Sequence, residues 1–347
     1  MNPNQSDLAA HLQGQEPSDI FLSKLLSGRK ILIVGHLNPD GDAVGSAAAL
    51  ALGLRHLGRE VTVGLSGLVP SNLDFLMRPR DMFVRLAYGP ELAGEFERMI
   101  LVDCHSLHRA WSDTAAFVPH GPVLPFVAID HHSLGQEPAF FEAAFLDYQA
   151  AATSELIFKV LKKINAPMSK DIADSLLAGL ISDTGSFSQN NVTSECLRQA
   201  SELVALGADI ERINRALKQN WPLSRMKLLA KALATLKVHL GGRVATIMVT
   251  EPMFREAGSD LSETEGLVEY TLLLAKVELG ALIKYNGPRQ TRVSLRSRPG
   301  VDARALAIHF GGGGHQLAAA YLEEDCEPEQ ALEKFLARAP VHLTEAM

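Results

Sequence analysis

The sequence lacks the features that mark exported and membrane-spanning proteins. Its three cysteines are far apart and form no Cys-x-x-Cys pair, which disfavours a disulfide framework and indicates a reducing, cytoplasmic location. No uncharged apolar run reaches the ~18 residues that a membrane helix needs, so we expect no membrane partner. The polar N-terminus has neither the basic end nor the apolar stretch of a signal peptide, and we expect none.

Positive charge is also scarce. Lys and Arg number 33 against 40 Asp and Glu, which gives a net charge of −7. Proteins that bind long duplex nucleic acid draw affinity from many phosphate contacts, so we expect no such partner. A small phosphorylated substrate at one local site is compatible with this charge, and a bound metal would offset part of it. The 347 residues, 47% of them hydrophobic, predict one large or two ordinary globular domains.

Short apolar runs alternate with helical patterns in the first part of the chain. The runs RKILIVGH, EVTVGLSG, RMILVDCHS and LPFVAIDHH predict buried strands. Their alternation with helices predicts an α/β fold, with a mostly parallel sheet and helices on both faces. We place this domain at 14–194, a helical connector at 195–238 and a smaller α+β domain at 239–347.

Polar side chains gather where the predicted strands end. Because ligands bind beyond the carboxyl ends of parallel strands, we expect these groups to share one edge of the sheet. Asp183 closes an apolar helix, where a carboxylate opposes the helix dipole unless a cation lies nearby. The groups at the strand ends are His36, Asp40, Asp42, Asp103, Asp130, His131 and His132.

Each cluster also has an ordinary explanation. An Asp at a strand-to-helix turn caps the following helix, and we expect Asp42 to cap one that begins near Ala43. His131 and His132 could form a pair on the surface. The cap explains one carboxylate, but neither the second one nor His36.

Together, six groups favour a metal centre. Four carboxylates and two imidazoles exceed the needs of one divalent ion and suit two ions that share carboxylates. Oxygen-rich sites with one His per ion suit Mn²⁺, with Mg²⁺, Co²⁺ or Fe²⁺ as alternatives. Two ions about 3.5–4 Å apart are the usual apparatus for hydrolysing a phosphoester. The six groups are His36, Asp40, Asp42, Asp103, His131 and Asp183.

A glycine run marks the second predicted domain. The run GGGGH at 311–315 includes Gly312, Gly313, Gly314 and His315, and Arg296 precedes it in SLRSR. We expect the run to open a helix, whose backbone N–H groups would bind a phosphate or carboxylate. The alternative is a flexible loop.

Four motifs, GHLNPDGDAVGS, LVDCHS, IDHH and GLISDTGSF, resemble in content and order those of the DHH phosphoesterase family. The segment VSLRSR…VDARALAIHFGGGGHQLAAA resembles the family's DHHA1 substrate domain. The layout is most similar to the branch of bifunctional oligoribonucleases and 3′-phosphoadenosine 5′-phosphate phosphatases. This resemblance implies a metal-dependent exonuclease that releases 5′ mononucleotides from short RNA, a phosphatase, or both. The alternative is a phosphodiesterase for cyclic or linear dinucleotides.

The resemblance also implies roles for individual residues. One ion would bind His36, Asp40 and Asp103, and the other would bind Asp42, Asp103, His131 and Asp183. His132 would face the substrate phosphate, and Asp130 would orient the histidines.

The far end of the substrate would contact residues of the second domain, namely Arg296, Gly312, Gly313, Gly314 and His315. Arg109 could touch a phosphate or lie solvated on the surface, and the sequence leaves both open. It leaves a homodimer open as well.

Overall fold

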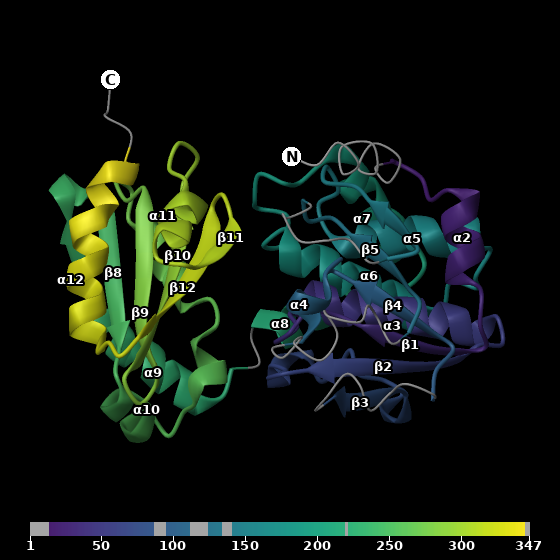
Figure 1. The fold of residues 1–347 in the computed structure, drawn as a ribbon, viewed down its shortest axis with the longest axis horizontal. Coiled ribbons are helices and arrows are strands. Elements are labelled where there is room, and N and C mark those ends of the chain that lie inside the picture. Colours follow the sequence, from purple (N-terminus) through teal and green to yellow (C-terminus); the bar gives the residue numbers. More distant parts are fainter. Residues whose placement is uncertain (1–13, 87–94, 112–123, 134–140, 219–220, 344–347) are drawn as a thin grey trace. The chain divides into compact units, whose positions relative to one another are not determined.

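The computed structural model describes residues 14–86, 95–111, 124–133, 141–218 and 221–343 (Figure 1). The chain divides into two compact units, 1–220 and 221–347. The range 195–238, predicted as a connector, contributes helices α7 (Ser194–Ala205) and α8 (Ile210–Lys218) to the first unit and α9 (Leu223–Ala234) to the second. The domain boundaries themselves stay a prediction.

The first unit is built on a six-stranded sheet in the order β3-β2-β1-β4-β5-β6. Every neighbouring pair is parallel, which confirms the predicted α/β fold. The central strands are apolar along their length because both faces of the sheet are covered. The strands are β1 (Lys30–Val34), β2 (Glu60–Ser66), β3 (Phe83–Leu86), β4 (Arg98–Val102), β5 (Phe126–Asp130) and β6 (Ala143–Leu146).

Alternate residues of β1 point into two different cores. Ile31 and Ile33 pack with apolar residues of the long helices, whereas Leu32 and Val34 pack with the segment that contains Leu107. Helix α3 also packs along α6, an arrangement that brings the start of one helix near the end of the other. The helices of this unit, besides α7 and α8, are α2 (Asp19–Leu25), α3 (Gly41–His56), α4 (Leu107–Ala110), α5 (Thr153–Lys163) and α6 (Lys170–Asp183).

The second unit has its own six-stranded sheet, in the order β11-β12-β10-β9-β8-β7. Strands β8 and β9 are parallel and the other neighbours are antiparallel. The strands are β7 (Lys237–His239), β8 (Val244–Val249), β9 (Leu279–Gly287), β10 (Gln290–Ser297), β11 (Gly313–His315) and β12 (Ala318–Glu324), and the helices besides α9 are α10 (Glu251–Ala257), α11 (Ala303–His309) and α12 (Pro328–Arg338). None of the helices in the described ranges is long and apolar enough to cross a membrane.

The glycine run does not open a helix, and that prediction is wrong. Helix α11 ends just before the run, and the glycines lead into β11, an edge strand paired with β12. Gly311 follows the helix with a φ of 76°, a conformation that ends a helix and favours glycine. At Gly312 a Cβ would lie 2.2 Å from the carbonyl oxygen of Ala320, so the strand approaches its neighbour too closely for a side chain.

Candidate metal centre

Residues distant in sequence meet at the carboxyl ends of three adjacent strands. Strands β1, β4 and β5 are neighbours; His36 lies two residues beyond β1, Asp103 follows β4, and Asp130 ends β5. Helix α3 begins at the same edge with Asp40 as its N-cap. Helix α6 ends there at Asp183. The parallel strand order therefore collects groups from four separate segments of the chain.

His36, Asp40 and Asp103 form one compact group. The Nε2 atom of His36 lies 3.8 Å from Asp40 Oδ1 and 3.4 Å from Asp103 Oδ2. Asp40 Oδ1 also accepts hydrogen bonds from the N–H groups of Asp42 and Ala43, at 2.9 and 3.1 Å. Asp40 is thus the helix cap, and the prediction of Asp42 as the cap is wrong. The helix begins at Gly41 because Asp40 has extended backbone geometry, which places Asp42 in the first turn.

Asp42, His131 and Asp183 form a second group beside the first. The Nε2 atom of His131 lies 3.2 Å from Asp183 Oδ2 and 3.7 Å from Asp103 Oδ1. Asp42 is completely buried and Asp103 nearly so. Asp103 approaches the histidines of both groups and is therefore placed between them.

The N-terminus of α5 holds two of these carboxylates. The N–H groups of Thr153 and Ser154 donate to Asp42 at 2.6 and 3.0 Å, and the Thr153 hydroxyl donates to Asp103 Oδ1 at 2.8 Å. The positive end of a helix stabilises negative charge at this position. Sequence reasoning missed Thr153, whose only signal is its place at the start of the helical pattern TSELIFKVLKK.

The clustered ionisable groups shift one another's pKa values. Burial, followed by the nearby carboxylates of Asp103 and Asp183, raises the pKa of Asp42 well above its usual range. Burial also raises the pKa of Asp183 to about 6, against the opposing effect of His131. Burial alone would lower the pKa of His131, but Asp183 and the other carboxylates raise it well above normal. The metal-free site therefore retains protons that a bound cation would displace.

The donor atoms fit divalent cations. The Nε2 atom of His131 is buried and faces carboxylate oxygens of Asp183 and Asp103, at 3.2 and 3.7 Å, as a metal ligand would. Carboxylate oxygens and imidazoles without a thiolate suit Mn²⁺ and similar ions. Three groups have ligand atoms within 4.8 Å of one another: His36–Asp40–Asp103, Asp42–His131–Asp183 and Asp103–His131–His132.

Asp130 lies behind this cluster and contacts two imidazoles. Its Oδ1 accepts from Nδ1 and the backbone N–H of His132, at 2.7 and 3.1 Å, and its Oδ2 lies 2.6 Å from Nδ1 of His105. Burial opposes ionisation, but the hydrogen bonds from both imidazoles hold the pKa of Asp130 far below its usual range. The Nδ1 atom of His131 lies instead 3.2 Å from the carbonyl oxygen of Ala150.

Arg109 lies beside the same pair of residues. Its guanidinium approaches His132 Nε2 at 3.4 Å and Asp130 Oδ2 at 4.0 Å, and 37% of its side chain is exposed. Arg109 is therefore part of the edge of the site and still reaches solvent. Sequence reasoning missed its neighbour His105, whose signal is its position two residues after Asp103 in LVDCHS.

Two of the predicted substrate residues of the second unit, Arg296 and His315, lie in one row of its sheet. Arg296 on β10 pairs with Ala318 on β12, and Ala318 pairs with His315 on β11. Directly paired residues point to the same face, so Arg296 and His315 flank a small side chain. We call these three residues the Arg296–His315 row. Gly313 and Gly314 are exposed next to it, which leaves backbone groups accessible to a ligand.

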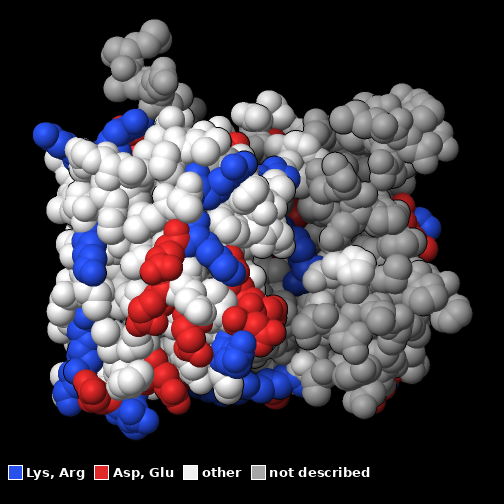
Figure 2. All heavy atoms as spheres, turned by 60° about the vertical axis from the view of Figure 1, so that its left-hand side comes forward, with Lys and Arg blue, Asp and Glu red and all other residues white. Residues whose placement is uncertain are grey.

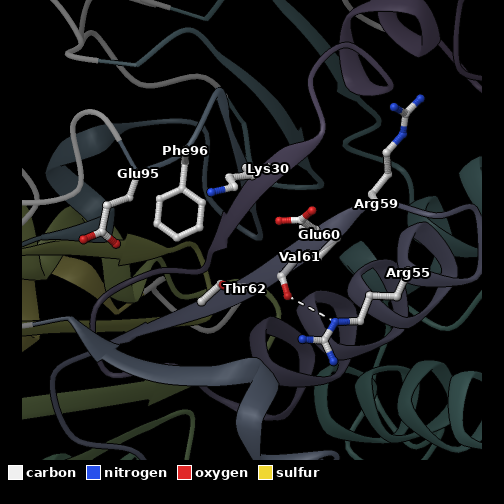
Figure 3. Close-up of a pocket in the computed structure, with 8 residues that line it drawn as sticks. All are labelled: Lys30, Arg55, Arg59, Glu60, Val61, Thr62, Glu95 and Phe96. Atoms are coloured by element: carbon white, nitrogen blue, oxygen red, sulfur yellow. Dashed lines mark hydrogen bonds between the residues drawn. The ribbon is translucent and has the colours of Figure 1, made fainter.

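A separate cavity of about 670 Å³ lies at the other end of the first sheet (Figure 3). Lys30 and Glu60, the first residues of β1 and β2, line it, whereas the candidate metal centre follows the last residues of the strands. Its lining has no histidine or aspartate, so it does not offer the same ligand set. The remaining lining residues are Arg55, Arg59, Val61, Thr62, Glu95 and Phe96.

Comparison with known proteins agrees with this architecture. A family model described as "DHH family, N-terminal domain" matches residues 30–180, which include the parallel sheet and most of the clustered side chains. The chain belongs to the DHH family of phosphoesterases, a class of hydrolases that act on phosphoester bonds.

Several relatives match beyond this domain. The bifunctional oligoribonuclease and PAP phosphatase NrnA of Thermus thermophilus is 31% identical, over 91% of each chain. A cyclic-di-AMP phosphodiesterase, GdpP of Geobacillus thermodenitrificans, is 28% identical over 87% of this chain and 46% of its own length. A probable manganese-dependent inorganic pyrophosphatase of Enterococcus faecalis is 30% identical over 53% of this chain and 56% of its own length.

A solved structure shows the same fold over nearly the whole chain. The exopolyphosphatase-related protein of Bacteroides fragilis superposes with a TM-score of 0.83 and 26% identity, over 96% of this chain and 97% of its own. The fold and the relatives together indicate use of a divalent metal in this family.

Proposed function

We propose that this protein hydrolyses short oligoribonucleotides from one end, releasing 5′ mononucleotides, and also dephosphorylates 3′-phosphoadenosine 5′-phosphate. The observation that carries the proposal is the pair of ligand groups that meet at Asp103. Similarity to an oligoribonuclease and PAP phosphatase over 91% of both chains supports this choice of substrate.

Two divalent ions, Mn²⁺ by preference and otherwise Mg²⁺, Co²⁺ or Fe²⁺, are proposed as cofactors. One would be held by His36, Asp40 and Asp103, and the other by Asp42, Asp103, His131 and Asp183. Ions so paired activate water and offset the charge that develops on phosphoryl oxygens. The similarity to a probable manganese-dependent pyrophosphatase supports the choice of metal.

The side chains around the proposed metal ligands would assist proton transfer and contact the substrate phosphate. His132 would face the scissile phosphate and either polarise it or assist proton transfer to the leaving oxygen. Asp130 would keep the His132 ring oriented through the 2.7 Å contact with its Nδ1. Arg109, which reaches the same Nε2 and solvent, would contact a phosphoryl oxygen.

The second unit would bind a different part of the substrate. Arg296, His315 and the backbone of Gly312, Gly313 and Gly314 would form hydrogen bonds to its phosphates. Among the described residues on the face drawn in Figure 2, basic side chains are interspersed with acidic ones. The net charge of −7 favours a short substrate over a long duplex.

A direct assay tests the proposal. Purified protein with Mn²⁺ is given four substrates in parallel: five-nucleotide RNA, pApA, 3′-phosphoadenosine 5′-phosphate and cyclic di-AMP. We expect hydrolysis of the first three and accumulation of 5′ mononucleotides from the RNA. Activity on cyclic di-AMP alone would contradict the proposal.

A cyclic- or linear-dinucleotide phosphodiesterase is the second candidate. Similarity to the cyclic-di-AMP phosphodiesterase supports it, although that similarity covers less than half of the relative. The same four-substrate assay separates the two. We also propose that the protein acts in the cytoplasm, in keeping with its three free, buried cysteines.

A further inference from the structure

A chain of hydrogen bonds runs from His105 through Asp130 to His132. Each oxygen of Asp130 lies within 2.7 Å of the Nδ1 atom of one imidazole. Asp130 has no exposed surface, and the side chains of His105 and His132 are only 10% and 12% exposed. An enclosed network of this kind restricts each member to one orientation.

The network sets the orientation of His132. Because an ionised Asp130 can only accept, each contacting Nδ1 carries a proton. The Nε2 atom on the other side of the His132 ring is approached by the Arg109 guanidinium at 3.4 Å. The contact with Asp130 therefore fixes the direction in which Nε2 points.

His105 is the nearest donor to the Oδ2 atom of Asp130. Without it, the Oδ2 atom of Asp130 would face Arg109 at 4.0 Å, beyond hydrogen-bond distance. A buried carboxylate oxygen without a donor is costly, and the carboxylate would turn to find another partner. Such a turn would also move the oxygen that holds His132.

We infer that His105 is a positioning residue, which locks Asp130 and through it aims His132 at the substrate. The inference deepens the proposed function, since it rests on His132 as the group that faces the phosphate. His105 does not touch the substrate in this role. Its contribution is to the orientation of a group that does.

Two substitutions distinguish the effect of the His105 N–H donor from the effect of the volume of its side chain. His105→Phe keeps a ring of similar size without an N–H, whereas His105→Asn places an amide N–H near the original Nδ1. For His105→Phe we expect kcat on short RNA to fall by about 10- to 100-fold, the usual scale for groups that support a site from behind, with KM little changed. His105→Asn should recover most of the loss. Equal losses in both variants would overturn the inference, as would a wild-type kcat in His105→Phe.

A double substitution tests whether His105 acts through His132. If it does, adding His105→Phe to His132→Ala should lower kcat no further than His132→Ala alone. Independent, multiplying losses would overturn the inference. Bis(p-nitrophenyl) phosphate, a simple phosphodiester, serves as a second substrate, so that the comparison of single and double variants does not depend on RNA binding.

A measurement that does not depend on catalysis tests this inference separately from the proposed function. Nitrogen NMR of the metal-free protein reports the protonated Nδ1 of His132 through its hydrogen bond to Asp130. We expect this signal to shift or broaden in His105→Phe and to be retained in His105→Asn, with thermal unfolding as the check that each variant is folded. An unchanged signal in His105→Phe would overturn the inference. A wild-type protein inactive on all substrates would instead defeat the proposed function.

Discussion

The carboxyl edge of the first sheet and the Arg296–His315 row of the second were both predicted as parts of the site, but they are built in opposite ways. At the first, carboxylates such as Asp42 and Asp103 are buried and held by donors from α5. At the second, His315 and its glycine neighbours are exposed on an edge strand. The first carries concentrated charge with little solvent around it, and the second presents backbone groups and the side chain of His315 to water.

This difference suits the two regions to different tasks, namely binding a cation and binding the substrate. Buried, mutually repelling carboxylates are costly until a cation neutralises them, which fits the role of metal site proposed for the first region. Exposed donors gain little free energy each because water competes with the ligand, so the second region is suited to adjusting substrate affinity. The predictions below follow from that contrast.

Asp103→Asn should have the largest effect. Asp103 lies between the two ligand groups, and the amide keeps its volume but removes the charge that both ions would share. Loss of several kcal/mol of charge stabilisation corresponds to a fall in kcat of about 10³-fold. Activity on short RNA with Mn²⁺ measures it, and Asp171→Asn, on the exposed start of α6, is the matched control. Near-wild-type kcat in Asp103→Asn would mean that the first region is not the reaction centre.

Removing the metal should expose the cost of the buried charges. The pKa of Asp183 is raised from 3.8 to about 6, so the folded state binds its proton more tightly than the unfolded chain does. The stability from this proton is present below pH ~4 and is lost as pH rises to about 6. The raised pKa of His131 extends the decline above its usual value of 6.5.

The measurement is the Tm of chelator-treated protein between pH 4.5 and 8, with and without Mn²⁺. We expect the Tm of the metal-free protein to fall across this range and Mn²⁺ to remove most of the fall. A metal-free Tm that rises steadily with pH would contradict the reading of the first region as a strained cation site.

The Arg296–His315 row should give the smallest change. For His315→Ala we expect KM to rise about tenfold with kcat nearly unchanged, because one hydrogen bond to a charged group is lost equally from substrate and transition state. His309→Ala, at the exposed end of α11, is the matched control. Steady-state kinetics on five-nucleotide RNA provide both constants. A loss of kcat without a change in KM would erase the distinction between the two regions.

Much of the first region was predictable because a parallel sheet can be recognised from the sequence of such a chain. Alternating apolar runs and helical patterns indicate a parallel sheet, and a parallel sheet brings the residues after β1, β4 and β5 to one edge. The glycine run was harder to interpret: the same residues can open a helix or form an edge strand, and the pairing of β11 with β12 decides between them. Asp40 caps the helix in place of Asp42 because the backbone is extended at Asp40 and helical two residues later. The spacing of the two residues in the sequence does not specify this difference.

The sequence by itself determined the fold class, the family and the set of ionisable side chains at the strand ends, because these follow from local periodicity and from motif content and order. Only the tertiary structure decided which groups meet. The local patterns around His105 and Thr153 do not show which carboxylates they contact. They donate to Asp130 and Asp103 because neighbouring strands and the start of α5 bring them there. Hydrogen-bond partners far apart in the chain are set by packing, and no local pattern encodes them.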